Sequence, residues 1–134
     1  MIIQHQVKRT AKARAERKQY VNSQCRSHIE SGFISDALGS EHFYESREYD
    51  QSNLQATFLV ARELDQPRPF KCFDSGGVEA YRMHTVPQLV QLGLALEQHK
   101  MGALGKVFML RQMIDAATTV DEVNAIDWDT PIPE

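Results

Sequence analysis

The chain has 134 residues, of which 42% are hydrophobic and 25% charged, an ordinary balance for a single globular domain. It has no run of 18 apolar residues, and charged residues follow the first apolar ones too closely for a secretory signal, so we expect neither a membrane span nor export. Cys25 and Cys72 are far apart in the sequence, which favours two reduced, buried thiols over a disulfide framework.

The charge is spread unevenly along the chain. The net charge is -3, but the segment from Lys8 to Arg26 carries +6, so the remaining residues carry -9. A basic segment of this kind can bind nucleic acid, an anionic surface, an acidic neighbour or a second copy of the acidic body. The partner-binding candidates in it are Lys8, Arg9, Lys12, Arg14, Arg17 and Lys18.

The alternative for the basic segment is a solvated helix face, and we favour it. Apart from Tyr20, no aromatic residue is interleaved with the charges, as base-stacking would require. The isoelectric point of about 5.9 is also low for a dedicated nucleic-acid binder.

Residues 8–31 predict a helix, because they lack Gly and Pro and are rich in Ala, Lys, Arg and Gln. Gly32 followed by Phe33 predicts a left-handed end to this helix. Apolar residues form only a thin stripe on it, which predicts docking on one side: Val7, Ala11, Ala15, Val21, Cys25, His28 and Ile29.

Two β-prone runs, Phe33–Ile34 and His42–Tyr44, enclose turn-forming residues and predict a small hairpin. Ser46 is the expected N-cap of a helix from Arg47 to about Leu64. Pro67 and Pro69 should end that helix, because each disfavours a helical residue before it.

A second hairpin is predicted where Pro69–Phe73 and Val78–Met83 flank the turn sequence Asp74-Ser75-Gly76-Gly77. We expect the following helix to cover one face of this hairpin. That helix should begin at about Val86, because Thr85 and Gln88 form a capping box, and should run to about Ala117.

The long helix carries two adjacent apolar stripes, so it needs more than one partner and a homo-oligomer is expected. The first stripe is Leu89, Leu92, Leu96, His99, Ala103, Leu110 and Met113, and the second is Val90, Leu94, Met101, Leu104 and Phe108. Thr118 with Asp121, or Thr119 with Glu122, predicts the cap of a short final helix.

The predicted fold class is therefore α+β, in a single domain of residues 1–134. Residues 8–31 form the basic helix, 32–84 the hairpin-helix-hairpin region, and 85–128 the long helix plus the short helix. The Pro-rich residues 129–134 should form a frayed tail.

No familiar catalytic or cofactor motif occurs in the sequence, which has no phosphate-binding Gly-rich loop, no Gly-x-Ser-x-Gly, no Cys-x-x-Cys and no His-Glu-x-x-His. The five histidines form no close pair, so a metal site would need convergence with Cys25 or Cys72. We expect a protein that is not an enzyme and that uses no metal, cofactor or small-molecule substrate. Trp128, the one tryptophan, is a candidate partner anchor, although a packed side chain beside Ile126 is favoured.

An ordered set of short sequence pieces resembles a known family. The pieces are Gly32-Phe33, Ser35-Asp36-Ala37-Leu38-Gly39, Tyr44-Glu45-Ser46, Asp50-Gln51-Ser52-Asn53-Leu54, Pro69-Phe70-Lys71-Cys72, His84-Thr85 with Gln88-Leu89, His99, and Ala116 to Val120 through Ala125-Ile126-Asp127-Trp128. Together they resemble the uncharacterised domain of tail-fibre and tail-accessory proteins of tailed bacteriophages and prophages. The resemblance covers about residues 8–128.

The resemblance implies a non-enzymatic structural or adaptor component of the virion, associated with tail fibres or the baseplate and so with viral attachment. It implies protein–protein interaction with tail-fibre or baseplate proteins of the same phage, in the virion tail and, during assembly, in the host cytoplasm. The alternative is a tail-fibre assembly chaperone that the virion does not retain. The family has no catalytic residues to carry over.

Overall fold

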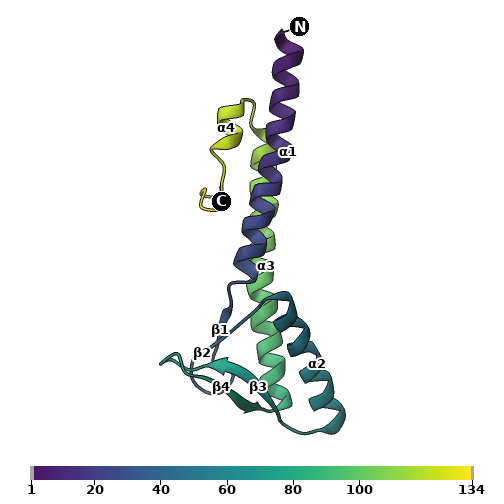
Figure 1. The fold of residues 1–134 in the computed structure, drawn as a ribbon, viewed down its shortest axis with the longest axis vertical. Coiled ribbons are helices and arrows are strands. Elements are labelled where there is room, and N and C mark those ends of the chain that lie inside the picture. The colour runs from purple at the N-terminus through teal and green to yellow at the C-terminus, as the bar shows by residue number, and fades with distance from the viewer. Residues whose placement is uncertain (1, 134) are drawn as a thin grey trace. The chain divides into compact units, whose positions relative to one another are not determined.

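The computed structural model describes residues 2–133 and contains, within them, four helices and four strands in the order α1, β1, β2, α2, β3, β4, α3, α4 (Figure 1). The predicted α+β class is confirmed. The chain packs as two compact units, which are described separately below. One is His28–Met101, and the other is the described part of Met1–Ser27 together with that of Gly102–Glu134.

The unit of residues 28–101 is built on one antiparallel sheet with strand order β1-β2-β3-β4. The strands are β1 (Phe33–Ser35), β2 (His42–Tyr44), β3 (Arg68–Phe73) and β4 (Glu79–His84). Both predicted hairpins are therefore confirmed, and the pairing of Phe43 with Phe73 joins them into a single sheet. Gly77 in the second turn has φ 78°, a conformation that favours glycine.

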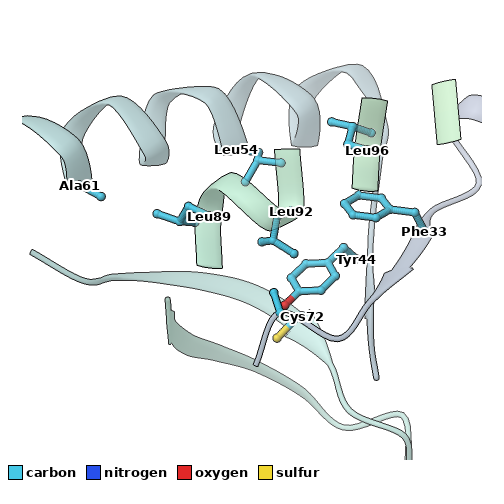
Figure 2. Close-up of a cluster of buried hydrophobic side chains, with 9 residues drawn as sticks. Phe33, Tyr44, Leu54, Ala61, Cys72, Leu89, Leu92 and Leu96 are labelled. Atoms are coloured by element: carbon cyan, nitrogen blue, oxygen red, sulfur yellow. The ribbon is translucent and has the colours of Figure 1, made fainter. Parts of the chain in front are cut away.

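The hydrophobic core of this unit lies between one face of the sheet and two helices, α2 (Glu48–Leu64) and the first half of α3 (Val86–Ala116). Figure 2 shows Leu54 and Ala61 of α2 and three leucines of α3 above the ring of Tyr44 and the thiol of Cys72. The three are Leu89, Leu92 and Leu96, from the predicted first stripe, and all are buried. The prediction that the long helix covers the second hairpin is confirmed, with α2 adding to the cover.

The predicted N-cap at Ser46 is wrong, because α2 begins one residue later and Arg47 occupies the cap position. The Arg47 N–H and guanidinium Nε both donate to Asp50 Oδ2 at 3.0 Å. Ser46 is instead turned toward the end of α1 (Ile2–Ile29), where its hydroxyl donates to the Ile29 carbonyl and accepts from the Gly32 N–H. Because the Ser46 hydroxyl forms hydrogen bonds at the end of α1, it does not point toward the first turn of α2.

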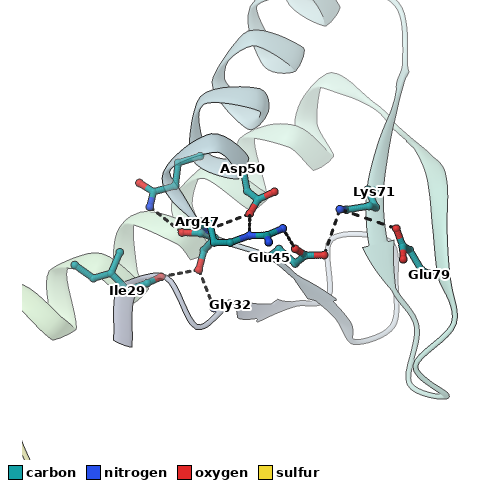
Figure 3. Close-up of polar contacts among 9 residues, drawn as sticks. Ile29, Gly32, Glu45, Arg47, Asp50, Lys71 and Glu79 are labelled. Carbon is teal, nitrogen blue, oxygen red and sulfur yellow. Dashed lines mark hydrogen bonds and ion pairs between the residues drawn. The ribbon is translucent and has the colours of Figure 1, made fainter. Parts of the chain in front are cut away.

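Charged side chains connect the sheet to the start of α2 in this unit (Figure 3). Glu45 accepts from Arg47 and lies 3.2 Å from the ammonium group of Lys71, which is also 4.0 Å from Glu79. His99 of α3 donates from Nε2 to the carbonyls of His28 and Ile29, at 2.9 and 3.2 Å. These contacts fix the end of α1 and the start of α2 beside the sheet, and His99 connects the end of α1 to the middle of α3.

In the other unit, α1 and α3 run antiparallel, as the paired contacts along them show (Figure 1). Lys18 forms an ion pair with Asp115, and Arg111 donates to Asn22 at 3.0 Å. The Cys25 thiol donates to the Ala103 carbonyl at 3.5 Å. The helix begins at Ile2 rather than at Lys8 as predicted, because nothing in residues 2–7 breaks a helix.

The predicted capping box of α3 is confirmed, since the Thr85 N–H donates to Gln88 Oε1 at 2.8 Å and the Gln88 N–H to Thr85 Oγ1 at 3.3 Å. Of the two predicted caps for α4 (Val120–Asn124), the structure has the one from Thr119, whose hydroxyl accepts from the Glu122 N–H. Beyond α4 there is no further helix or strand up to residue 133, but three hydrogen bonds between Asp127 and Thr130 form a turn. Glu134, the last residue of the predicted tail, lies outside the described residues.

Candidate functional site

The six basic candidates on α1 fall into two groups, and the first group contacts the C-terminal part of the chain. Arg14 donates from Nε and Nη2 to the Ala117 carbonyl, at 3.2 and 2.6 Å. Arg17 donates to the Ile126 carbonyl at 2.5 Å, and Lys18 pairs with Asp115. These three cations therefore satisfy carbonyls and a carboxylate at the end of α3 and after α4, where a helix C-terminus favours positive charge.

The second group, Lys8, Arg9 and Lys12, is exposed to solvent. The ammonium group of Lys12 lies 3.9 Å from Glu16, one turn further along the helix, a surface pair of little energetic consequence. Residues 3–9 are all exposed, including the apolar side chains of Ile3 and Val7. Partner binding through this part of α1 stays a prediction.

Trp128 is half-buried, in the unit formed by the two ends of the chain. Its backbone N–H donates to Gln24 Oε1 at 3.0 Å, and the ammonium group of Lys106 lies 4.7 Å from the centre of its ring. The neighbouring Ile126 is buried. A ring that packs on one side and remains partly exposed on the other fits either alternative, so partner binding through Trp128 also stays a prediction.

The two apolar stripes of α3 differ in burial. Five members of the first stripe are buried and two, His99 and Met113, are half-buried, whereas every member of the second is exposed. In the 28–101 unit these are Val90, Leu94 and Met101, with exposed fractions of 43%, 61% and 62%. In the other unit they are Leu104 and Phe108, at 45% and 60%. Large side chains left exposed on a helix in this way are typical of a binding face.

An apolar groove of about 550 Å³ lies between α2 and α3 in the 28–101 unit. Leu54 and Leu89 are buried at its lining, whereas Val90 and Leu94 of the second stripe are exposed there. Gly93 also lines the groove, and a Cβ atom added to it would meet no atom within 4 Å. The rim of the groove is polar. It carries two carboxylates, Glu48 of α2 and Glu97 of α3, several uncharged side chains, and Lys100, which forms an ion pair with Glu97.

A cluster of polar side chains lies on the core-facing side of the sheet, and the sequence did not predict it. The Tyr44 hydroxyl lies 2.8 Å from His84 Nε2, and His84 Nδ1 lies 2.6 Å from the Arg82 carbonyl. A carbonyl only accepts, so Nδ1 carries the proton and Tyr44 donates to Nε2. The Arg82 guanidinium donates to the Cys72 carbonyl at 2.9 Å and to its sulfur at 3.4 Å.

Burial sets the protonation states in this cluster. It lowers the pKa of His84 and raises the pKa of Tyr44, so both are neutral at pH 7. Tyr44, Cys72 and His84 have exposed fractions of 0%, so no solute reaches them in this structure. The cluster is structural, and its four members come from three strands, a proximity that no local sequence pattern reveals.

The predicted thiols are confirmed as free and buried. Within residues 2–133, no group of three or more His, Cys, Asp or Glu side chains is arranged to hold a metal ion. Nor is any helix of the described chain long and apolar enough to cross a membrane.

Comparison with known proteins gives one family match. The model of a family described as a domain of unknown function, DUF4376, matches residues 12–129, most of the chain. No curated protein and no solved structure gives a significant match.

Proposed function

This chain belongs to the DUF4376 family, a domain of unknown function, and we propose that it is a non-enzymatic structural or adaptor component of a phage tail. It would associate with tail-fibre or baseplate proteins of the same phage, and with further copies of itself. Its location would be the virion tail, after assembly in the host cytoplasm.

The observation that carries the proposal is the exposed second stripe of α3. This stripe leaves apolar surface exposed on a helix whose first stripe is already largely buried. Its members are Val90, Leu94 and Met101 in one unit and Leu104 and Phe108 in the other. Exposed apolar surface on a helix costs free energy in water, and a protein partner removes that cost. This is the surface of a binding module, and the ordered sequence resemblance supplies the phage tail as its setting.

Mass spectrometry of purified particles from the source phage or the induced prophage tests the proposal. A tail component should be present in particles at a fixed small multiple of the tail symmetry, counted relative to a major tail protein. Detection in the infected-cell lysate but not in washed particles would contradict a permanent tail role and support an assembly chaperone.

A further inference from the structure

We infer that the groove between α2 and α3 receives the exposed N-terminal segment of α1, residues 3–12, from a second copy of this chain. The inference deepens the homo-oligomer part of the proposed function and names the two surfaces that would meet. It rests on three observations, which concern the segment, the groove and their charges.

The segment is helical and faces solvent along most of its length, and Thr10 is its one buried residue. Residues 3–9 are exposed, and Ile3 and Val7 are 75% and 61% exposed. Because they are four residues apart on a helix, the two side chains lie on one face and present a single apolar ridge. A helix this exposed gains little stability from its own sequence, so docking its ridge would stabilise it.

The groove has the complementary form. Its lining includes exposed Val90 and Leu94 and buried Leu54 and Leu89, an apolar surface between two helices. Gly93 leaves open space at the point where a side chain would otherwise project. An amphipathic helix that places residues i and i+4 into such a groove is a recurring mode of protein recognition.

The charges also match. The segment carries Lys8, Arg9 and Lys12 and no acidic residue. The groove is lined by two carboxylates, Glu48 and Glu97, and one cation, Lys100, a net charge of -1, and the whole 28–101 unit has a net charge of -5. Opposite charges at the rim favour the encounter and disfavour docking of an acidic helix.

Two aliphatic side chains and a rim of exposed charges give weak association, so the dissociation constant should be on the order of 0.1 mM. Local concentration in an assembled particle would raise the occupancy of such a contact. In solution the contact should appear as self-association that depends on protein and salt concentration.

Sedimentation equilibrium of the full chain tests the inference with two variants. Ile3→Asp combined with Val7→Asp removes the ridge, and Gly93→Trp fills the groove. Each should weaken self-association by about tenfold or more, without unfolding the chain, because all three positions are open to solvent. The matched controls are Gln4→Asp with His5→Asp, which adds the same charge elsewhere on the exposed segment, and Gly102→Trp, at another open position of α3.

Mixing the two variants shows whether the contact is between copies. The ridge variant keeps an intact groove and the Gly93→Trp variant keeps an intact segment, so the mixture should form a 1:1 complex at concentrations where neither variant self-associates alone. A wild-type chain that remains monomeric into the millimolar range would overturn the inference. So would self-association that survives both variants, which would assign it to another surface.

The self-association test and the mass spectrometry of particles can fail independently. A chain that is monomeric but present in purified particles would remove the inference and leave the proposed function intact. A chain that self-associates through the groove but is absent from particles would do the reverse.

Discussion

Gly32 is a residue whose identity the backbone and a neighbouring ring both require. Its φ is 96°, in the left-handed region where side chains other than glycine are strained. A Cβ atom at this position would lie 2.1 Å from Phe43 Cζ, far inside van der Waals contact. Glycine thus lets the chain turn from α1 into β1 while Phe43 lies against the turn.

We predict that Gly32→Ala lowers the free energy of unfolding by about 1–3 kcal/mol, from backbone strain and displacement of the Phe43 ring. Gly102→Ala is the control, because Gly102 lies in open space on a helix, and it should stabilise the chain by about 0.5–1 kcal/mol. Urea unfolding of both variants gives the comparison. Equal shifts for the two would refute the role assigned to Gly32.

His84 makes stability depend on pH. Burial lowers its pKa below the ordinary 6.5, so well above pH 7 it is neutral in both the folded and the unfolded chain. As the pH falls below 6.5, the unfolded chain takes up the proton first, and the free energy of unfolding therefore decreases until the folded pKa is passed.

We therefore expect stability to fall between roughly pH 7.5 and pH 5.5, and His84→Gln to reduce that fall. The glutamine variant will be less stable at the higher pH, because it disturbs the contact with Tyr44. The test is consequently the difference between the two pH values for each protein, measured by urea unfolding. An unchanged difference in the variant would assign the pH dependence to other groups.

At the scale of elements, α1 binds the C-terminal segment through its cations rather than through apolar side chains alone. Val21 and Cys25 are buried on α1, but toward its N-terminus the contacts to the chain end are made by Arg14, Arg17 and Lys18. The arginines satisfy carbonyls at positions where the helical pattern has ended. A substitution there should loosen the end of the chain more than it changes the α1 helix itself.

We predict that Arg14→Gln destabilises its unit by about 1–3 kcal/mol, because the Ala117 carbonyl loses a charged donor. Lys12→Gln should change stability by less than about 0.5 kcal/mol, since the long, solvent-exposed ion pair of Lys12 with Glu16 contributes little. Hydrogen exchange of residues 117–126, read together with urea unfolding, measures both. Faster exchange in the Lys12→Gln variant, or no increase in exchange in the Arg14→Gln variant, would contradict the role assigned to Arg14.

Element positions could be predicted from the sequence wherever the determining contacts are local. The Thr85–Gln88 box, the Gly77 turn and the left-handed Gly32 depend on residues within a few positions, and all three predictions hold. The predicted cap at Ser46 is wrong because the Ser46 hydroxyl donates to the Ile29 carbonyl, 17 residues earlier, a contact that no local pattern reveals. Joining of the two hairpins through Phe43 and Phe73 is non-local for the same reason.

For the candidate binding surfaces too, local features were predictable and features that depend on distant contacts were not. Two stripes on α3 were predictable from helical periodicity, but which stripe forms core depends on where α1, α2 and the sheet pack. The basic residues were recognisable from composition, whereas the internal contacts of Arg14 and Arg17 depend on chain segments about a hundred residues away. The groove has no local pattern of its own, because its lining comes from two helices.

The two units differ in the sign of their net charge. The 28–101 unit carries -5, whereas residues 1–27 with 102–134 carry +2. If copies of the chain associate as we propose, contact between unlike units would be attractive, and salt would screen this attraction. The exposed apolar side chains add a contribution that salt does not screen, so the two can be separated experimentally.

Apolar side chains are also exposed on α3 in the unit of residues 1–27 and 102–134. Phe108 is 60% exposed, so Phe108→Asp should change the free energy of unfolding of the isolated chain by no more than about 0.5 kcal/mol. If Phe108 contacts a tail protein, the same variant should be depleted from particles when it is co-expressed with the tagged wild-type chain. Gln112→Asp, at an exposed polar position of α3, adds the same charge and should be incorporated normally. Equal incorporation of the two variants would exclude Phe108 from the tail interface, and depletion of both would indicate that negative charge alone is rejected there.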